Sequence, residues 1–586
     1  MLVPLSMWIL AVSLGQSPAP VAADAGWLKA VPADIDVAVR VRGVDATHAD
    51  LMAMLRIMSP TLAERAEQGL TGPLVQFRQK FGEAAARTPW VSLIRTAAPG
   101  GEGRPPFAIL VLNDDYPGVL KAIGGGKDPD LKHQEGGYDA FKNPAGEAGY
   151  AVKGPGFIAF GPDQALIAAI ARPGEKTLDK ALAPALTKQF LAGDVGVYVS
   201  ASTLVARYSD QIDQARQTFM GLLDQAGQQA GNAGSMNAAK EIYGALFDSL
   251  KDAEALTINV DVAGEGLSLA GVLTVKPDTA LARAGAQAAP GTAADLAGLP
   301  PDASFYVYMN MDASTVDRLQ GMSIRMMNPG GKPTPDQAKA LALFGEVGRV
   351  ETIGSLTFDG GMRGMNVTHV ADPKKYIAAC QANIQALKGG NGPSSVYKEV
   401  KIESNVENYR GLTFSHIIAT LDFDKLAQLN PNNPGGAAAV KSMFGGETMN
   451  SWLGTDGQRV FQVTAPTWND VKVQIDTFLK GNAGIGTVAG FKSVRSRLPE
   501  QASLVALVSA QGLVRMFASQ IAATLNKPDL KAPGDLPKEP VLFGVSLTPK
   551  PPSGYEFHLV VPSQIGPIFE KGLVPVFQSI TPPSKP

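Results

Sequence analysis

The stretch Leu299-Pro300-Pro301-Asp302-Ala303-Ser304-Phe305-Tyr306-Val307-Tyr308-Met309 shows how this chain is built. A turn that contains proline leads into a short apolar strand, and a sequence with helical periodicity follows it. Similar stretches begin at Val31, Leu191 and Leu498. Together they predict the first strands of four related modules, each with the element order β-α-β-β-α.

The first of these strands alternates between apolar and other residues. Apolar residues occupy every second position from Ile35 to Val41, and Asp36 and Arg40 lie between them. A period of two is the spacing of side chains on one face of a strand. The pattern therefore predicts a half-buried strand that turns its charged residues to solvent.

The order of elements predicts that the chain is duplicated. At 586 residues it is too long for one core at ~150 residues per domain. We predict a first half at 26–288, in which modules 27–125 and 188–288 lie around a middle unit at 133–173. The predicted second half is 296–581, in which modules 297–390 and 496–581 lie around a middle unit at 395–480. The predicted fold class is α+β: duplicated two-layer β-α-β-β-α modules, mainly antiparallel sheets with helices packed on one face. The connection from Gln287 to Ala297, rich in Ala, Gly and Pro, is expected to be the weakest.

The N-terminus resembles a secretory signal peptide. An apolar run from Leu5 to Gly15 is followed by small residues that offer cleavage after Ala23 or Ala25. The run is shorter than the ~20 residues of a membrane-spanning helix. We therefore predict a signal peptide at 1–25, a periplasmic or extracellular protein and no transmembrane helix in the mature chain. No Lys or Arg precedes the run, so an uncleaved anchor is the competing interpretation. Residues 582–586 are a Pro-rich tail.

Composition excludes several classes of partner and site. The formal net charge is −2, which gives no electrostatic reason to expect nucleic acid. The chain has one cysteine, Cys380, so it can form neither an intrachain disulfide nor a cysteine-based zinc site. Apolar residues make up 45% and charged residues 18% of the chain, as in folded domains.

The signal peptide, the repeated hairpins and the strand openings Leu299-Pro300-Pro301-Asp302 and Leu498-Pro499-Glu500-Gln501 resemble a known class. The chain is similar to secreted bacterial proteins of a domain-of-unknown-function class with repeated α/β modules. The resemblance spans most of the mature chain. It implies an architecture and a location outside the cytoplasm, and no catalytic residues.

Two patterns suggest phosphate or metal chemistry. Gly124-Gly125-Gly126-Lys127 resembles a phosphate loop, but Asp128 replaces the Ser or Thr that binds magnesium, and the glycines follow a predicted helix. We predict a loop that terminates that helix. The five histidines lack metal-ligand spacing: His48, His133, His369, His416 and His558. Of these, His369, His416 and His558 lie in predicted strands and could meet at a metal only through the fold, so they are interpreted as ordinary sheet residues.

Three further groups have a structural explanation. Asp114-Asp115 could bind a cation, but a carboxylate before a helix is more often its N-cap. Cys380 lies on a predicted helix among apolar residues, which indicates a buried, unreactive thiol. Soft thioether ligands could bind copper, and five methionines cluster in the third module: Met309, Met311, Met322, Met326 and Met327. Met322 and Met326 share a predicted helical face with Val316 and Leu319, so core packing is the better interpretation.

The sequence thus predicts no catalytic, cofactor-binding or metal-binding residue and no cofactor. Our leading hypothesis is a non-catalytic protein with a binding or structural role at the cell envelope. Its partner would be an unknown envelope protein or another ligand. The alternatives are a secreted hydrolase whose site is assembled from distant residues, and a membrane-anchored scaffold if the N-terminal segment is retained.

Overall fold

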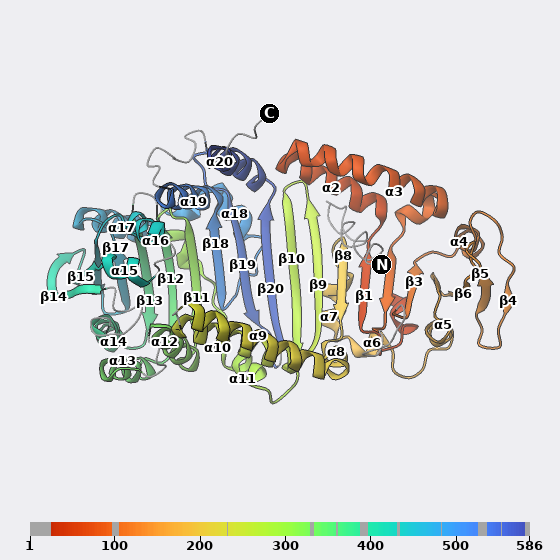
Figure 1. Cartoon of the computed structure of the whole chain (residues 1–586), viewed down its shortest axis with the longest axis horizontal. Helices are drawn as coiled ribbons and strands as arrows, with labels where there is room; N and C mark the ends of the chain where they lie inside the picture. The colour runs from red at the N-terminus through yellow and green to blue at the C-terminus, as the bar shows by residue number, and fades with distance from the viewer. Residues whose placement is uncertain are drawn as a thin grey trace. The chain divides into compact units, whose positions relative to one another are not determined.

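A computed structural model of the chain describes residues 25–96, 105–230, 233–327, 333–358, 361–386, 397–429, 434–481, 483–525, 536–552 and 554–580 (Figure 1). The predicted tail, and the predicted signal peptide apart from Ala25, lie outside these residues. Contacts divide the chain into two compact units. Unit 1 combines Met1–Asp213, Ser249–Arg283 and Pro552–Leu559, and unit 2 combines Gln214–Asp248, Ala284–Pro551 and Val560–Pro586. This grouping departs from the predicted halves in the helical segment 214–248, in residues 284–288 and in the C-terminal segment 552–559.

Unit 1 contains a sheet flanked by helices. Its strands are β1 (Val37–Val41), β2 (Trp90–Ile94), β3 (Phe107–Val111), β4 (Lys132–His133), β5 (Asp139–Lys142), β6 (Ala148–Gly154), β7 (Phe157–Gly161), β8 (Val195–Val199), β9 (Ala253–Ala263) and β10 (Gly266–Val275). Its helices are η1 (Ala25–Lys29), α2 (Val44–Met58), α3 (Pro60–Arg87), α4 (Tyr116–Ile123), α5 (Gln164–Ala171), α6 (Leu178–Ala181), α7 (Pro184–Leu191) and α8 (Ala201–Arg207). Three more helices have residues assigned to both units, α9 (Ser209–Ala230), α10 (Ala233–Asp252) and α11 (Ala280–Gln287).

Unit 2 has the same mixture of elements. Its strands are β11 (Phe305–Met311), β12 (Val350–Thr357), β13 (Arg363–Val370), β14 (Tyr397–Tyr409), β15 (Leu412–Leu421), β16 (Thr448–Thr455), β17 (Arg459–Thr464), β18 (Leu504–Ser509) and β19 (Leu542–Pro549), and β20 (Gly554–Pro562) divides at Leu559 between the units. Its helices are η2 (Ala294–Gly298), α12 (Ala313–Met327), α13 (Pro335–Gly345), α14 (Pro373–Ala386), α15 (Phe423–Leu429), α16 (Pro434–Phe444), α17 (Trp468–Lys480), η5 (Ile485–Thr487), α18 (Ala489–Arg495), α19 (Ala510–Thr524) and α20 (Ile565–Ile580). In the described residues, no helix is both long and apolar enough to cross a membrane.

The strands pair antiparallel and in the same order in both units. In unit 1 the order is β4-β5-β6-β7-β3-β2-β1-β8-β9-β10. In unit 2 it is β14-β15-β16-β17-β13-β12-β11-β18-β19. The mixture of helices with antiparallel strands predicted from the sequence is therefore present, and the strands form a large antiparallel sheet. In each unit the first strand of one predicted module, β1 or β11, pairs with the first strand of the next, β8 or β18.

The backbone bonds beside these strands also correspond. Asp36 N donates to Ile94 O at 3.1 Å, as Ser304 N does to Leu356 O at 2.9 Å. Asp194 N donates to Val260 O at 3.0 Å. The matching bond in unit 2 joins Ser503 N to Leu547 O at 2.9 Å.

Helices cover both faces of the sheet, which corrects the prediction that they pack on one face. Neighbouring residues of β2 belong to different cores: Trp90 packs with α3 and α4, and Val91 packs with α5 and α7. In unit 2 one core contains α17 and α18, and others contain α12, α13 and α14. The reason lies in strands such as Phe107–Val111, which are apolar at every position and must be buried on both sides.

The predicted half-buried strand at Ile35–Val41 is also corrected. Asp36 is fully buried and Arg40 is 4% exposed, whereas Val37 and Val39 are only partly buried. Because β1 lies between β2 and β8 and both faces are covered, its charged side chains are enclosed instead of facing solvent. The expected weak connection at Gln287 to Ala297 is likewise held in place, since Gly291 exchanges two backbone bonds of 2.9 Å with Ala502.

Candidate functional site

Unit 1 contains a charged cluster made of Arg40 from β1, Arg42 just after it, Asp50 from α2, Asp194 before β8 and Asp261 from β9, and of these Arg40 and Asp194 are buried. Arg42 Nη2 lies 3.0 Å from Asp194 Oδ1 and donates to Asp50 Oδ2 at 3.2 Å. Arg40 Nη1 donates to the carbonyl oxygen of Gly193 at 3.3 Å. The cluster therefore joins α2 to the strands β1, β8 and β9.

Burial shifts the acidity of this cluster. It raises the pKa of Asp194 to about 6, against the opposing effects of the Val262 N–H and the Arg42 charge. Burial also lowers the pKa of Arg40 to about 10, and the neighbouring positive charge of Arg42 acts in the same direction. Strongly shifted titratable groups gather at functional sites, so this cluster is the first candidate that the structure offers.

The chain folds tightly around the cluster because two glycines permit close approach. Gly193 has a φ of +60°, and a Cβ there would lie 2.1 Å from Asn259 Oδ1. A Cβ on Gly196 would lie 1.9 Å from the carbonyl oxygen of Phe190. These contacts bring α7, β8 and β9 close together beside Asp194.

The arrangement fits a structural role better than catalysis. Asp194 is fully buried, its Oδ1 pairs with Arg42, and its Oδ2 accepts a 3.0 Å hydrogen bond from Val262 N. A general base must reach the proton that it removes. Here both carboxylate oxygens already bind groups of the protein, so Asp194 connects strand ends.

A second buried carboxylate, Asp36, has a similar role. Its Oδ2 accepts from Thr96 N at 2.6 Å and from Thr96 Oγ1 at 2.8 Å, and it pairs with the Arg207 guanidinium of α8. Arg207 Nη1 also donates to the Thr96 carbonyl oxygen at 2.7 Å. These bonds tie the end of β2 to α8.

Unit 2 holds an aromatic cluster around His416 of β15. The imidazole stacks on Trp452 at 4.4 Å, and the Trp452 ring lies 5.8 Å from that of Trp468. His416 Nε2 lies 3.0 Å from Asn450 Oδ1, and Nδ1 lies 3.7 Å from Glu403 Oε2. Trp452 is only 3% exposed, so its ring stabilises the core and offers no stacking surface to a ligand.

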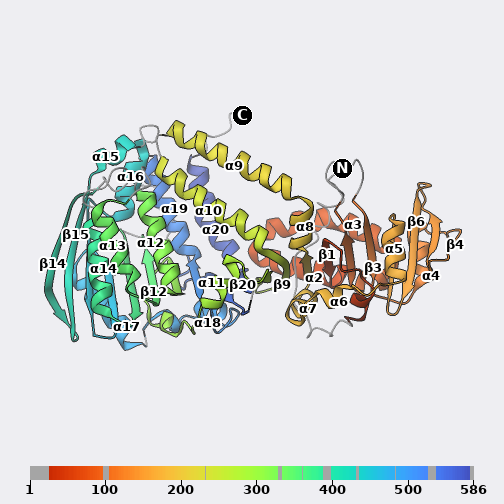
Figure 2. The ribbon, with the colours of Figure 1, turned by 90° about the horizontal axis from the view of Figure 1, so that it is seen from below.

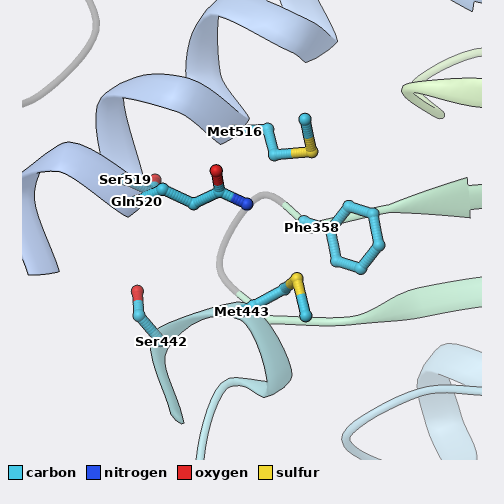
Figure 3. A pocket seen from close by; sticks show the side chains of 6 residues that line it. All are labelled: Phe358, Ser442, Met443, Met516, Ser519 and Gln520. Carbon is cyan, nitrogen blue, oxygen red and sulfur yellow. The ribbon is translucent and has the colours of Figure 1, made fainter. Parts of the chain in front are cut away.

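A small cavity lies between β12, α16 and α19 (Figure 3). Its volume is about 10 Å³, close to the space for one water molecule. The thioethers of Met443 and Met516 and the ring of Phe358 line it with Ser442, Ser519 and Gln520. This lining has no acid, base or nucleophile pair, and the cavity is far smaller than the ~300 Å³ of typical ligand sites.

The five histidines considered in the sequence analysis do not lie together in the structure. Each has its own neighbour: His48 lies 4.0 Å from Glu67, His133 lies 3.0 Å from Asp139, His369 lies 3.1 Å from Asp295, His416 packs as above and His558 lies 3.0 Å from Glu556. Within the described ranges, no three His, Cys, Asp or Glu side chains lie together as metal ligands would.

Several sequence interpretations are confirmed. Gly124–Gly126 follow α4, and Gly126 N donates back to Lys121 O at 2.9 Å, so the glycines end the helix. Asp115 caps the same helix through a 3.0 Å bond from Gly118 N. Cys380 is only partly buried, but burial still raises the pKa of its thiol to about 12, which keeps the thiol protonated.

The methionines are only partly described. Met311 of β11 packs against a core that includes Val316 and Phe344, in agreement with the interpretation as core residues. Met309 is partly buried on β11. The side chains of Met322, Met326 and Met327 lie outside the described part of the structure.

Sequence reasoning missed the charged cluster around Arg40 and Asp194. Arg40 and Arg42 matched the polar positions of a half-buried strand, and nothing local marked Asp194 as their partner. The available signal was their spacing: in the predicted strand the two arginines stand at positions i and i+2, which share a face. A carboxylate just before another strand could then pair with them across the sheet.

The outermost strand of unit 2 is a long exposed edge. In the described structure β14 pairs with one strand, β15, and Figures 1 and 2 show it as the last strand of its sheet. Its register with β15 shifts between Tyr397 and Glu399 and again between Glu403 and Glu407. The exposed side chains along it include Lys398, Glu399, Lys401 and Ser404. An edge of this kind presents backbone N–H and C=O groups that can pair with another strand.

Comparison with known proteins adds no relative: no family model matches the chain, and neither a curated protein nor a solved structure is similar to it.

Proposed function

We propose that this is an exported, non-catalytic protein of the cell envelope, and that it binds a protein partner by strand addition at β14. The observation that carries the proposal is the exposed edge of β14, a strand of 13 residues whose described pairing is with β15 alone. Strand addition is a common mode of peptide and protein recognition, in which main-chain hydrogen bonds supply affinity and side chains supply specificity.

The chemistry of β14 supports a specific partner over general aggregation. Charged residues and bulges are devices that natural sheets use to discourage uncontrolled edge pairing. Glu399 and Lys401 are exposed on the strand, and Lys401 Nζ lies 2.5 Å from Glu403 Oε1. An incoming strand must match this charge pattern, so the edge rejects most strands and accepts a complementary one.

We further propose that the two halves arose by duplication of a pair of modules. The support is the common strand order around β1 and β11 and the matched backbone bonds of Asp36 with Ser304 and of Asp194 with Ser503. On this proposal unit 1 carries charged residues where unit 2 has neutral ones. Superposition of an experimental structure of the halves tests it, and unrelated helix positions between the strands would count against it.

A photo-crosslinker in place of Ser404 tests the binding role. Ser404 is exposed on β14, and the same crosslinker in place of the exposed Lys492 of α18 is the matched control. Illumination of cells that make the full chain should give a crosslinked adduct from position 404 and none from position 492. If position 404 gives no adduct with any protein, the proposed role of β14 is wrong.

The export step is tested separately. We expect N-terminal sequencing of the envelope fraction to begin after Ala23 or Ala25, because small residues precede both points. A mature chain that begins at Met1 would favour the anchored-scaffold alternative. The secreted-hydrolase alternative has weaker support, because the buried carboxylates Asp36 and Asp194 are both paired with arginines.

A further inference from the structure

We propose that the partner of β14 is β14 of a second copy of this chain, paired antiparallel about a two-fold axis at Val400. This inference rests on the proposed binding role of β14 and names its occupant. A two-fold axis makes an interface self-complementary, so each residue must suit its counterpart on an identical strand. The charges of β14 satisfy that condition in this register.

With Val400 opposite itself, Glu399 lies opposite Lys401 of the second copy, and Lys401 lies opposite its Glu399. Both residues are exposed and directly flank Val400. Opposite charges in directly opposed cross-strand positions are favourable. The symmetry supplies two such pairs from one pair of residues.

The neighbouring register is disfavoured by the same charges. If Lys401 were opposite itself, the lysines would face one another and Glu399 would face Glu403 of the second copy. Like charges in directly opposed positions are destabilising. The charge order of β14 therefore accepts the register at Val400 and rejects the one next to it.

The register shift after Glu403 disfavours a pairing centred further along β14, towards its C-terminal end. The regular ladder with β15 runs from Glu399 to Glu403, and the register then shifts before Glu407. A pairing centred on Ile402 would carry both strands into this shift. A pairing centred on Val400 keeps Glu399–Lys401 opposite itself within the regular ladder, and it meets the shift between Tyr397 and Glu399 only at its two ends.

The apolar face of the same segment continues across the axis. Val400 is 4% exposed, and Ile402 packs with α14 residues such as Ile377 and Ile384. In an antiparallel pair, directly opposed residues lie on the same face. Val400 would therefore meet its counterpart beside the core that α14 covers.

The test is charge exchange measured by sedimentation equilibrium of the full chain. The wild type should dimerise. Glu399→Lys places lysine opposite lysine, and Lys401→Glu places glutamate opposite glutamate, so each variant should raise the dimer dissociation constant by about 100-fold. An equimolar mixture of the two variants should dimerise as the wild type does, because every opposed pair is again Glu with Lys. The double variant should also dimerise.

Lys492→Glu, an equal change of charge on exposed α18, is the control and should leave the dimer unchanged. A wild type that stays monomeric at about 100 µM, or a mixture no better than its separate variants, overturns the inference. The crosslinker at Ser404 separates this failure from that of the binding role. An adduct of twice the mass of the chain isolated from the same cells supports the second copy, and an adduct of any other mass shows a different partner at β14.

Discussion

The pH dependence of the free energy of unfolding should report the raised pKa of Asp194. Its raised pKa means that the folded state keeps a proton, between about pH 4 and pH 6, that the unfolded state releases. Stability from this residue therefore falls as pH rises through that window, by on the order of 3 kcal/mol. Asp194→Asn removes this titration. We therefore compare the free energy of unfolding of the wild type with that of the variant. The wild-type value minus the variant value should fall between pH 4 and pH 6 and stay level above pH 6. Urea denaturation at several pH values measures this difference.

Asp312 provides a control of opposite sign. Burial acts to raise the pKa of Asp312, but hydrogen bonds from Ser314 and Thr315 outweigh it and lower the pKa. The stability that it contributes is present above the ordinary pKa and is lost as pH falls. The corresponding difference for Asp312→Asn should therefore rise with pH below about pH 4. A difference for Asp194→Asn that rises between pH 4 and pH 6 would contradict the role assigned to its burial.

At the scale of elements, local patterns predicted most strands correctly because strand periodicity and turn residues are local properties. The hairpin of β6 and β7 and the Pro-containing approach to α17 follow directly from Gly154-Pro155-Gly156 and Ala465-Pro466-Thr467. The error at β1 had a different origin. Whether Arg40 meets solvent depends on α2, β8 and β9, which are distant in the chain, and alternation alone carries no information about them.

The same reasoning explains why helices on both faces were missed. Strands such as β2 and β3 have apolar residues at every position or nearly so, a pattern of strands buried on two sides. The charged residues of β14 are visible in the sequence, but its position at the edge of the sheet is not. The same Lys and Glu residues would also suit an ordinary exposed strand, so the edge was recognised only from the pairing with β15.

At the scale of the molecule, the compact units do not coincide with continuous halves of the sequence. Unit 1 includes Pro552–Leu559 from the far end of the chain. Within this unit β20 pairs with β10, and Phe557 covers Gly271, where an added Cβ would lie 2.2 Å from its ring. Tyr555 Oη also donates to the carbonyl oxygen of Leu281 at 2.7 Å. Pattern periodicity predicted a hairpin of β19 and β20 but could not show that β20 also completes unit 1.

This arrangement predicts that a change near the C-terminus loosens the strands of unit 1. Phe557→Ala removes the ring over Gly271 and should lower the free energy of local opening of β9 and β10 by about 2 kcal/mol, less than for a fully buried Phe. Tyr555→Phe removes one hydrogen bond and should lower it by about 1 kcal/mol. Native-state hydrogen exchange measures both effects, with β11 and β12 of unit 2 as the internal control. Because the lost contacts belong to unit 1, the amides of β11 and β12 should keep their protection. Equal loss of protection in both sets of strands, or none in β10, would show that Pro552–Leu559 does not stabilise unit 1.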